Sequence, residues 1–405
     1  MSLDIPDVSD PATFVAGFPH EVFRTLRERS PVHWQARDRD GRRGFWIVSR
    51  YEDVKYVSKN PRLFCSERGT NIRETQQGQG GRMMLMMDPP DHGRYRRLVS
   101  PGFTPRRIDA LASHIESTVD AVIDRVALKG ECDFVTDLAA ELPLRVIAEF
   151  LGVPEEDRHK LFDWSNRLIG FEDPEFMKDA ANLTAAIEMY GYADRLAEQR
   201  LAEPADDIPT LLLNAEVDGE RLSRPEFSAF FLLLAVAGNE TTRNLISHGM
   251  RLLIEHPEAC ERLLAERALL PTAIEEMLRF SPPVMYFRRT ATQDAEIGGV
   301  PIAAGDKVTV WYPSANRDAQ VFERADSFDI TRDPNDHLAF GVGEHFCVGS
   351  HLARLEIRVM FEKLLVRLPD IRPNGPIRYL HSHFINGVKS MPVRFTPERP
   401  FLEGK

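Results

Sequence analysis

The sequence from Ser223 to His256 predicts one unusually long helix, which restricts the folds open to this chain. Ser223 is the expected N-cap, Pro225 lies in the first turn, and Glu226 completes a capping box. The helical spacing of apolar residues then continues to about His256, and Pro257 follows. A helix of about 32 residues spans about 48 Å, so we expect it to cross the whole molecule.

Shorter segments on both sides of this helix predict a mainly α fold with a minor β part. Helical spacing recurs in residues 14–30, in residues 105–191 with breaks at Gly130, 152–154 and 170–174, in residues 349–368 and in a helix that ends near Phe280. Alternating apolar and polar residues predict short strands in residues 32–34, 44–48, 296–302, 307–311 and 392–395. No Gly/Ser-rich or Pro-rich linker divides the 405 residues, so we expect a single domain of residues 1–405.

The composition argues against several classes of protein. The net charge of −11 disfavours nucleic acid as a partner, because phosphate binding needs a basic surface. The four cysteines lie far apart without a C-x-x-C pair, which is typical of a reducing compartment. The N-terminus lacks the basic stretch and the apolar stretch of a secretory signal peptide. No segment approaches the roughly 20 apolar residues of a membrane span. We therefore expect a cytoplasmic protein without a membrane anchor.

A glycine-rich stretch from Phe340 to Gly349 surrounds a single cysteine, Cys347, in the pattern F-x-x-G-x-H-x-C-x-G. Glycines let the backbone turn sharply and approach a large flat ligand closely. A thiolate in such a loop, with amide N–H groups directed at the sulfur, suits a haem iron ligand. Two other interpretations are a buried cysteine in a glycine-rich loop and a zinc site built from His345, Cys347 and His351.

The full spacing of this stretch resembles the haem-ligand loop of the cytochrome P-450 family of haem-thiolate monooxygenases. The resemblance implies a cytochrome P-450 fold, with haem b between the long helix and the cysteine loop and Cys347 as the iron ligand. It points to the soluble bacterial members, because no N-terminal anchor helix is seen here. Within the loop, it implies haem contacts from Phe340, Gly341, His345 and Gly349.

The segment A-G-N-E-T-T, residues 237–242, lies in the middle of the long helix, where Gly and Thr are locally unfavourable. Threonine hydroxyls can bond to carbonyls one turn earlier, which bends a helix and opens a groove. One interpretation is a notch for helix packing. The resemblance instead implies an acid–alcohol pair for the reduction of O2, in which Thr241 holds a water or oxygen and Glu240 relays protons from solvent. It also implies that Ala237 and Gly238 contact the haem.

Glu276 and Arg279 form an E-x-x-R motif on a predicted helix, where positions i and i+3 share a face. Such a motif occurs by chance in a chain this charged. Its place between the acid–alcohol segment and the cysteine loop gives it weight, and the resemblance implies a buried ion pair that supports the haem-ligand region. We expect Arg317 or Arg324 as a third partner.

His92 and Arg96 lie one turn apart on a predicted helix. Alone, this pattern also fits a basic, solvated helix face. The resemblance implies that the pair binds the haem propionates, because two carboxylates favour charge-assisted donors. It implies the same role for His345 and for one of Arg288 and Arg289, of which the count back from Gly305 and Asp306 favours Arg289.

The predicted substrate pocket is apolar. Helical spacing back from Thr241 places residues of the long helix on the haem-facing side, and the resemblance adds three further segments. The predicted lining residues are Met84, Met86, Phe230, Leu233, Leu234, Ala237, Val284, Met285, Phe287, Phe384 and Ile385. Methionines adapt to irregular apolar ligands, although an apolar run of this kind is about as often plain core. We therefore expect a bulky apolar substrate.

Residues 236–244 and 384–389 look like those of actinobacterial enzymes that hydroxylate sterol side chains and methyl-branched lipids, with a terpenoid as the main alternative. The resemblance implies that O2 is a substrate and that a separate ferredoxin and its reductase supply electrons. The ferredoxin is expected to dock on the cysteine side, on a basic patch of Arg97, Arg106, Arg107, Arg354 and Arg358. The alternative for this patch is a set of solvated charges. Rival classes are a peroxygenase, against which the acid–alcohol pair argues, and a non-catalytic haem sensor.

Overall fold

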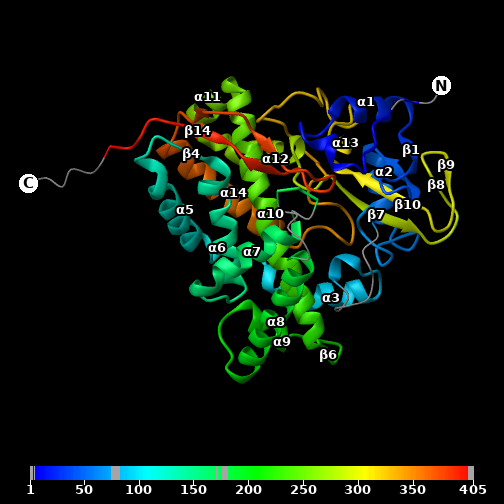
Figure 1. Cartoon of the computed structure of the whole chain (residues 1–405), viewed down its shortest axis with the longest axis horizontal. Coiled ribbons are helices and arrows are strands. Elements are labelled where there is room, and N and C mark those ends of the chain that lie inside the picture. Colours follow the sequence, from blue (N-terminus) through cyan, green and yellow to red (C-terminus); the bar gives the residue numbers. More distant parts are fainter. Residues whose placement is uncertain (1–2, 4, 74–82, 170–171, 176–180, 400–405) are drawn as a thin grey trace, which may run out of the picture.

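One long helix, α10 (Arg224–Glu255), passes through the middle of the molecule (Figure 1). The computed structural model describes residues 3, 5–73, 83–169, 172–175 and 181–399. The helix has 32 residues, and the Glu226 carboxylate accepts hydrogen bonds from the Ser223 N–H and hydroxyl, each at 2.8 Å. The predicted long helix and its capping residues are therefore confirmed.

The other helices surround α10 or lie beside the sheet. They are α1 (His20–Arg29), α2 (Tyr51–Lys59), α3 (Asp91–Val99), α4 (Pro105–Asp109), α5 (Ala112–Ala127), α6 (Glu141–Phe150), α7 (Arg158–Ile169), α8 (Ala181–Ala202), α9 (Ile208–Asn214), α11 (Pro257–Ala265), α12 (Leu270–Phe280), α13 (Tyr312–Ala315) and α14 (Ser350–Arg367). Short 3-10 segments are η1 (Pro11–Phe14), η2 (Met84–Met86), η3 (Ser100–Phe103), η5 (Glu155–Asp157) and η6 (Arg267–Leu269), and η4 (Phe134–Ala139) is a π-helix.

Close approach of α10 to its neighbours depends on glycine. A Cβ on Gly249 would lie 2.7 Å from Phe361 Cζ on α14 and 2.8 Å from Met277 Sδ on α12. These distances are shorter than van der Waals contact, so no larger residue fits without movement of the neighbours. Gly249 therefore sets the spacing between α10 and two other helices. These are α14, which follows the cysteine loop, and α12, which carries the E-x-x-R motif.

The strands form one five-stranded sheet and four smaller ones, and in the view of Figure 1 the larger sheet lies on the opposite side of α10 from α5, α6 and α14. The strands are β1 (Val32–Arg37), β2 (Arg43–Val48), β3 (Phe64–Cys65), β4 (Glu131–Asp133), β5 (Glu216–Val217), β6 (Glu220–Arg221), β7 (Tyr286–Ala291), β8 (Ala295–Ile297), β9 (Val300–Ile302), β10 (Lys307–Trp311), β11 (Arg372–Pro373), β12 (Arg378–Tyr379), β13 (Val388–Ser390) and β14 (Pro392–Arg394). The larger sheet has the order β1-β2-β10-β7-β3. In it, β10 pairs with β2 in parallel and with β7 in antiparallel orientation.

The predicted mainly α fold with a minor β part is confirmed. The helical spacing of residues 105–191 breaks at Gly130 as expected, and the short strand β4 directly after this break was not predicted. This short strand pairs with β14, with Cys132 opposite Val393, so its partner lies far away in the sequence and local spacing does not reveal it. Among the described helices, none is both long and apolar enough to cross a membrane.

Candidate functional site

The cysteine loop, residues 338–349, has a tightly constrained backbone just before α14. Gly343 has φ +81°, in the left-handed region that favours glycine. A Cβ at this position would also lie 2.8 Å from the carbonyl oxygen of Ser58 in α2. The Cys347 N–H donates to the Phe340 carbonyl oxygen at 2.9 Å and closes the loop. The sulfur is thus carried by a backbone that has little freedom to move.

Cys347 combines solvent accessibility with dense surroundings. It is solvent-accessible, whereas Cys65 is buried, yet protein atoms surround it closely. Burial raises the pKa of the Cys347 thiol, and the Gly349 N–H and the charges of Arg96 and Arg354 oppose that rise. Since coordination to a metal deprotonates a thiol outright, the N–H donor and the two cations suit a thiolate ligand. An accessible sulfur does not fit the interpretation as a plain buried cysteine.

The zinc interpretation is wrong for the described part of the chain. The one group of at least three His, Cys, Asp or Glu residues there whose ligand atoms lie within 4.8 Å of one another is Cys65, Glu67 and Asp88. His345 and His351 therefore do not gather around Cys347 as zinc ligands.

Four basic side chains come together beside the cysteine loop: His92 and Arg96 from α3, Arg289 from β7 and His345 from the loop. The ring centroids of His92 and His345 are 4.2 Å apart, and Arg96 Nη1 donates to the Phe346 carbonyl oxygen at 2.7 Å. Burial, together with the charges of Arg289, His92 and Arg96, lowers the pKa of His345 to about 2. Within the described ranges, none of the four lies within ion-pair distance of a carboxylate, although His92 and Arg289 are almost fully buried. A buried arginine such as Arg289 is costly without a counter-ion, so the two carboxylates of a haem fit this cluster.

The two adjacent arginines of β7 have different surroundings. Arg288 donates to the carbonyl oxygens of Arg68 at 2.8 Å and Asn71 at 3.3 Å, which ties β7 to the loop after β3. Arg289 is buried and donates from Nη1 to the Arg288 carbonyl oxygen at 2.9 Å, while burial lowers the pKa of its guanidinium. The geometry therefore favours Arg289 over Arg288 as the anion-binding residue, in line with the prediction.

The acid and the alcohol on α10 point in different directions. Thr241 Oγ1 donates to the Ala237 carbonyl oxygen at 2.6 Å, and both residues keep accessible surface although they lie in the middle of the molecule. The Glu240 side chain is buried, accepts a 2.9 Å hydrogen bond from Asn244 Nδ2 and pairs with Arg243. Glu240 therefore has no direct access to solvent, and its expected role as a proton relay stays a prediction. Its partners lie three and four residues later on the same helix, a spacing that brings side chains onto one face.

Gly238 has a packing role in this segment. A Cβ at this position would lie 2.9 Å from Ile147 Cδ1 on α6. Ile147 thus occupies the space that any other side chain would need. The interpretation of a helix-packing notch holds for this residue, and its assignment as a haem contact stays a prediction.

The E-x-x-R motif forms a fully buried, bidentate ion pair. Arg279 Nε and Nη2 each donate to the Glu276 carboxylate at 2.7 Å, and both side chains are completely inaccessible. The third basic partner is Arg332, whose Nε lies 3.1 Å from Glu276 Oε2, so the expectation of Arg317 or Arg324 is wrong. Arg317 is buried but lies over the Phe280 ring, and Arg324 is exposed and pairs with Asp329, so neither of them reaches Glu276.

The predicted substrate-pocket residues divide into two groups. Those with accessible or partly accessible surface are Met86, Leu233, Ala237, Val284, Phe287 and Phe384. Those that are buried are Met84, Phe230, Leu234, Met285 and Ile385. In the first group, the rings of Phe287 and Phe384 pack with centroids 5.5 Å apart, and Val284 forms a β-bridge with Ile385. Met285 and Phe230 are only 1% exposed and belong to the core, so they do not reach a ligand without rearrangement.

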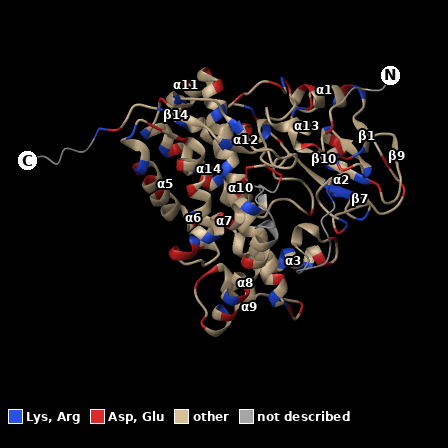
Figure 2. Cartoon of the chain, in the orientation of Figure 1, with Lys and Arg blue, Asp and Glu red and all other residues tan. Residues whose placement is uncertain are grey.

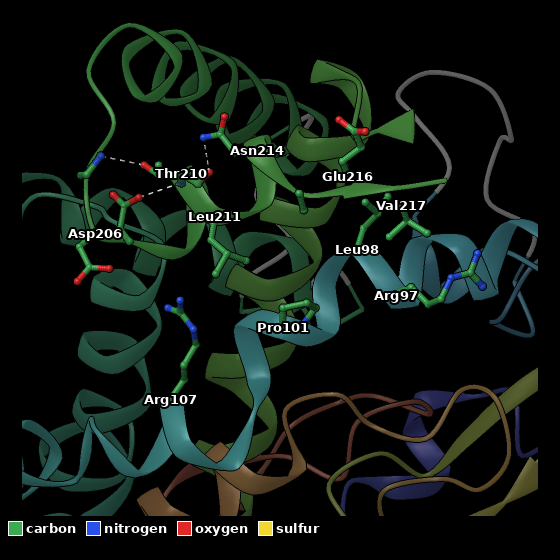
Figure 3. A pocket seen from close by; sticks show the side chains of 13 residues that line it. Arg97, Leu98, Pro101, Arg107, Asp206, Thr210, Leu211, Asn214, Glu216 and Val217 are labelled. Carbon is green, nitrogen blue, oxygen red and sulfur yellow. Dashed lines mark hydrogen bonds between the residues drawn. The ribbon is translucent and has the colours of Figure 1, made fainter. Parts of the chain in front are cut away.

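Two hollows on the described surface lie away from this site. One, of about 480 Å³, lies between the ends of α3 and α4 and the segment around α9 (Figure 3). The other, of about 720 Å³, lies between α7 and α8. Neither is lined by the cysteine loop or by any of the four basic residues beside it, so neither is the candidate site.

Comparisons with known proteins agree with the geometry of the site. The family model described as cytochrome P-450 matches residues 13–369. Over 402 residues the chain is 43% identical to steroid C26-monooxygenase of Rhodococcus jostii (strain RHA1), covering 96% of this chain and 84% of that protein. Over 387 residues it is 39% identical to methyl-branched lipid omega-hydroxylase of Mycobacterium bovis (strain ATCC BAA-935 / AF2122/97), covering 93% and 90%.

Two further comparisons extend this picture. Over 408 residues the chain is 38% identical to linalool 8-monooxygenase of Pseudomonas putida, covering 98% of this chain and 100% of that protein. The solved structure of a Mycobacterium marinum cytochrome P-450 in complex with pseudoionone superposes with a TM-score of 0.91 and 37% identity, covering 98% of this chain and 99% of that chain.

Proposed function

Since this chain belongs to the cytochrome P-450 family and is a monooxygenase, we propose that it hydroxylates a steroid side chain or a methyl-branched lipid. The observation that carries this proposal is the meeting of the Cys347 loop with four basic side chains that have no carboxylate partner in the described part of the chain, one of which, Arg289, lies over the Phe287 ring of the apolar wall. The cysteine suits an iron ligand, the basic residues suit the haem carboxylates, and the apolar wall suits a hydrocarbon substrate. Only the three features together indicate a haem-thiolate oxygenase.

The inferred cofactor is haem b, which when bound supplies the iron centre for O2 chemistry. Cys347 is its proposed iron ligand, and Arg96, Arg289 and the two histidines His92 and His345 are its proposed propionate contacts. The Gly349 N–H and the charges of Arg96 and Arg354 would support the thiolate once iron is bound, and the two arginines Arg96 and Arg289 would neutralise the propionates. The two histidines are held close together and low in pKa, so we expect them to act as neutral hydrogen-bond donors rather than as cations.

Thr241 and Glu240 are the proposed proton-handling pair. The Thr241 hydroxyl lies on the accessible face of α10, where it can bond to a water molecule after leaving the Ala237 carbonyl oxygen. Glu240 precedes Thr241 in the chain, and its carboxylate forms an ion pair with Arg243. Arg243 Nη1 also donates to Asn166 Oδ1 of α7 at 3.2 Å. Proton supply to Thr241 therefore requires the Glu240 carboxylate to exchange its Arg243 partner for water.

The proposed substrate class follows from the wall of the site and from the relatives. The wall residues with accessible surface are aliphatic or aromatic and carry no charge, so they favour a bulky hydrocarbon surface over an ionic ligand. Two of the relatives named above are a steroid C26-monooxygenase and a methyl-branched lipid omega-hydroxylase, and both of these substrate classes are largely hydrocarbon. A terpenoid is the second candidate, because one relative is a linalool 8-monooxygenase and one similar structure holds pseudoionone.

Electrons are proposed to come from a separate ferredoxin that docks near the cysteine loop. Acidic and basic residues are interspersed over the molecule, so a basic docking patch has to be local (Figure 2). Arg106 and Arg107 are exposed on α4 and form no ion pair among the described residues, whereas Arg354 is engaged with Glu275. Replacing Arg106 and Arg107 by Glu is expected to slow ferredoxin-supported turnover, with Arg262→Glu on α11 as a control. Equal turnover rates in the unsubstituted protein, the doubly substituted variant and the Arg262→Glu control would rule out this docking face.

An optical titration of the ferric protein tests the substrate class. A sterol, a methyl-branched fatty acid and a monoterpene alcohol are added separately, and the absorbance change of the haem is followed. A saturating high-spin shift with either of the first two supports the proposal, and a shift with the alcohol alone favours the terpenoid. Absence of any shift would reject all three classes while leaving the family assignment intact.

A further inference from the structure

A carboxylate next to the buried E-x-x-R pair serves a different part of the molecule. Glu275 precedes Glu276 on α12 but faces α14 and the cysteine loop. Arg354 donates to it through two hydrogen bonds, Nε to Oε1 and Nη2 to Oε2, each 2.7 Å. His337 lies 3.1 Å from Oε2 through its Nε2 atom. The three side chains therefore join α12, α14 and the beginning of the cysteine loop.

The hydrogen bonds of His337 define which nitrogen carries its proton. Nδ1 accepts a hydrogen bond from the Ala339 N–H at 3.2 Å, so Nε2 is the donor toward Glu275. Burial alone would raise the pKa of Glu275, but the hydrogen bonds from Arg354 and His337 lower it to about 2. Glu275 is therefore ionised at any physiological pH and holds both partners.

Arg354 connects this carboxylate to the cysteine through an aromatic ring. Its guanidinium lies over the Phe340 ring, 4.5 Å from the centroid, a distance typical of cation–π contact. The backbone carbonyl of the same Phe340 accepts the N–H of Cys347 at 2.9 Å. A displacement of Arg354 thus reaches the cysteine through one ring and one hydrogen bond.

We propose that Glu275, His337 and Arg354 form a clamp that positions the Cys347 loop for thiolate coordination. Glu275 and Arg354 are positioning residues, because they act through Phe340 and not on the iron or the substrate. The inference rests on the proposed role of Cys347 as the haem ligand. It assigns to Glu275, a residue outside the E-x-x-R pair, the task of holding Arg354 flat over the ring.

A simpler alternative is that Arg354 only supplies a positive charge near the sulfur. The two explanations give opposite expectations for Glu275→Gln. This variant leaves the Arg354 charge in place and removes a negative charge, so a purely electrostatic effect would stabilise the thiolate. If the clamp acts by position, the freed Arg354 leaves the Phe340 ring and thiolate coordination weakens, as it does in Arg354→Gln.

The test follows the loss of the thiolate-type absorbance of the carbon monoxide adduct in mild urea. Glu275→Gln and Arg354→Gln are each expected to shorten its half-time about tenfold, the loss typical of a charge-assisted hydrogen bond. The double variant is expected to decay no faster than either single one, because both changes open the same clamp. Lys363→Gln is the control, because Lys363 also lies on α14, is as exposed as Arg354 (33% against 34%) and donates to a carboxylate, Asp120, at 2.7 Å.

Far-UV circular dichroism under the same conditions separates the clamp from general stability. The clamp predicts that thiolate absorbance is lost well before helix in the two variants, and together with helix in the control. A half-time unchanged or lengthened in Glu275→Gln, or equal losses in Lys363→Gln, would overturn the proposal. If the unsubstituted protein shows no thiolate-type adduct at all, the proposed function fails first, and the two failures are thereby distinguished.

Discussion

Arg332 offers a sharp test of the buried ion cluster, because the sequence pointed to different arginines. Its Nε lies 3.1 Å from Glu276 Oε2, and its Nη1 donates to the Glu323 carbonyl oxygen at 2.8 Å. The Glu276 carboxylate is fully inaccessible, so water does not replace a lost donor. A hydrogen bond to a charged group contributes about 1.5–3 kcal/mol and a neutral one about 1 kcal/mol. Arg332→Gln is therefore expected to lower the free energy of unfolding by about 2–4 kcal/mol.

The matched control is Arg324→Gln. Arg324 belongs to the same loop and pairs with Asp329 at 3.0 Å, but its side chain is 67% exposed. An exposed pair of this kind contributes at most about 1 kcal/mol. Both variants are compared with the unsubstituted holoprotein by urea unfolding, followed by far-UV circular dichroism. Equal effects, or a larger effect in Arg324→Gln, would refute the reasoning that places Arg332 in the cluster.

Three further predictions follow from the described contacts. Gly249→Ala is expected to cost about 1–3 kcal/mol of unfolding free energy, because the added Cβ overlaps Phe361 and Met277; an unchanged urea midpoint contradicts this close packing. Thr241→Ala is expected to shift stability by no more than about 0.5 kcal/mol, yet to raise the hydrogen peroxide formed per NADH consumed; an equal peroxide yield removes the hydroxyl from the mechanism. The folded-state pKa of Glu275, about 2, lies below its usual 4.5, so its stabilising contribution is complete above about pH 4.5 and is lost as pH falls toward 2. Glu275→Gln should therefore weaken the pH dependence of stability across that window, and identical acid transitions by circular dichroism would contradict it.

The predictions from sequence succeeded where the determining residues are close together in the chain. The Ser223–Glu226 cap lies within one helical turn and identified the start of α10. The pairing of Glu276 with Arg279 also depends on a three-residue spacing and is present as expected. Local geometry of this kind is set by the helix itself, so it does not depend on the path of the rest of the chain.

The predictions failed where a contact depends on a segment that lies far away in the sequence. Arg332 reaches Glu276 because an irregular loop turns it inward, and no periodic pattern marks that turn. The strand β4 exists because β14 lies beside it. Glu240 is an intermediate case, because its partner Arg243 is within helical reach, but only the structure shows that this face of α10 is enclosed by protein. Gly238 likewise needed the position of Ile147 on α6 to show its packing role.

The most direct test of the central assignment is the absorbance spectrum of the reduced carbon monoxide adduct in three purified proteins. The unsubstituted protein and Cys65→Ser, in which a buried cysteine is changed, are expected to show the thiolate-type spectrum. Cys347→Ser is expected to lose it, because the sulfur held by the loop is the proposed iron ligand. A thiolate-type spectrum that persists in Cys347→Ser, or no haem absorbance in the unsubstituted protein, would contradict the assignment.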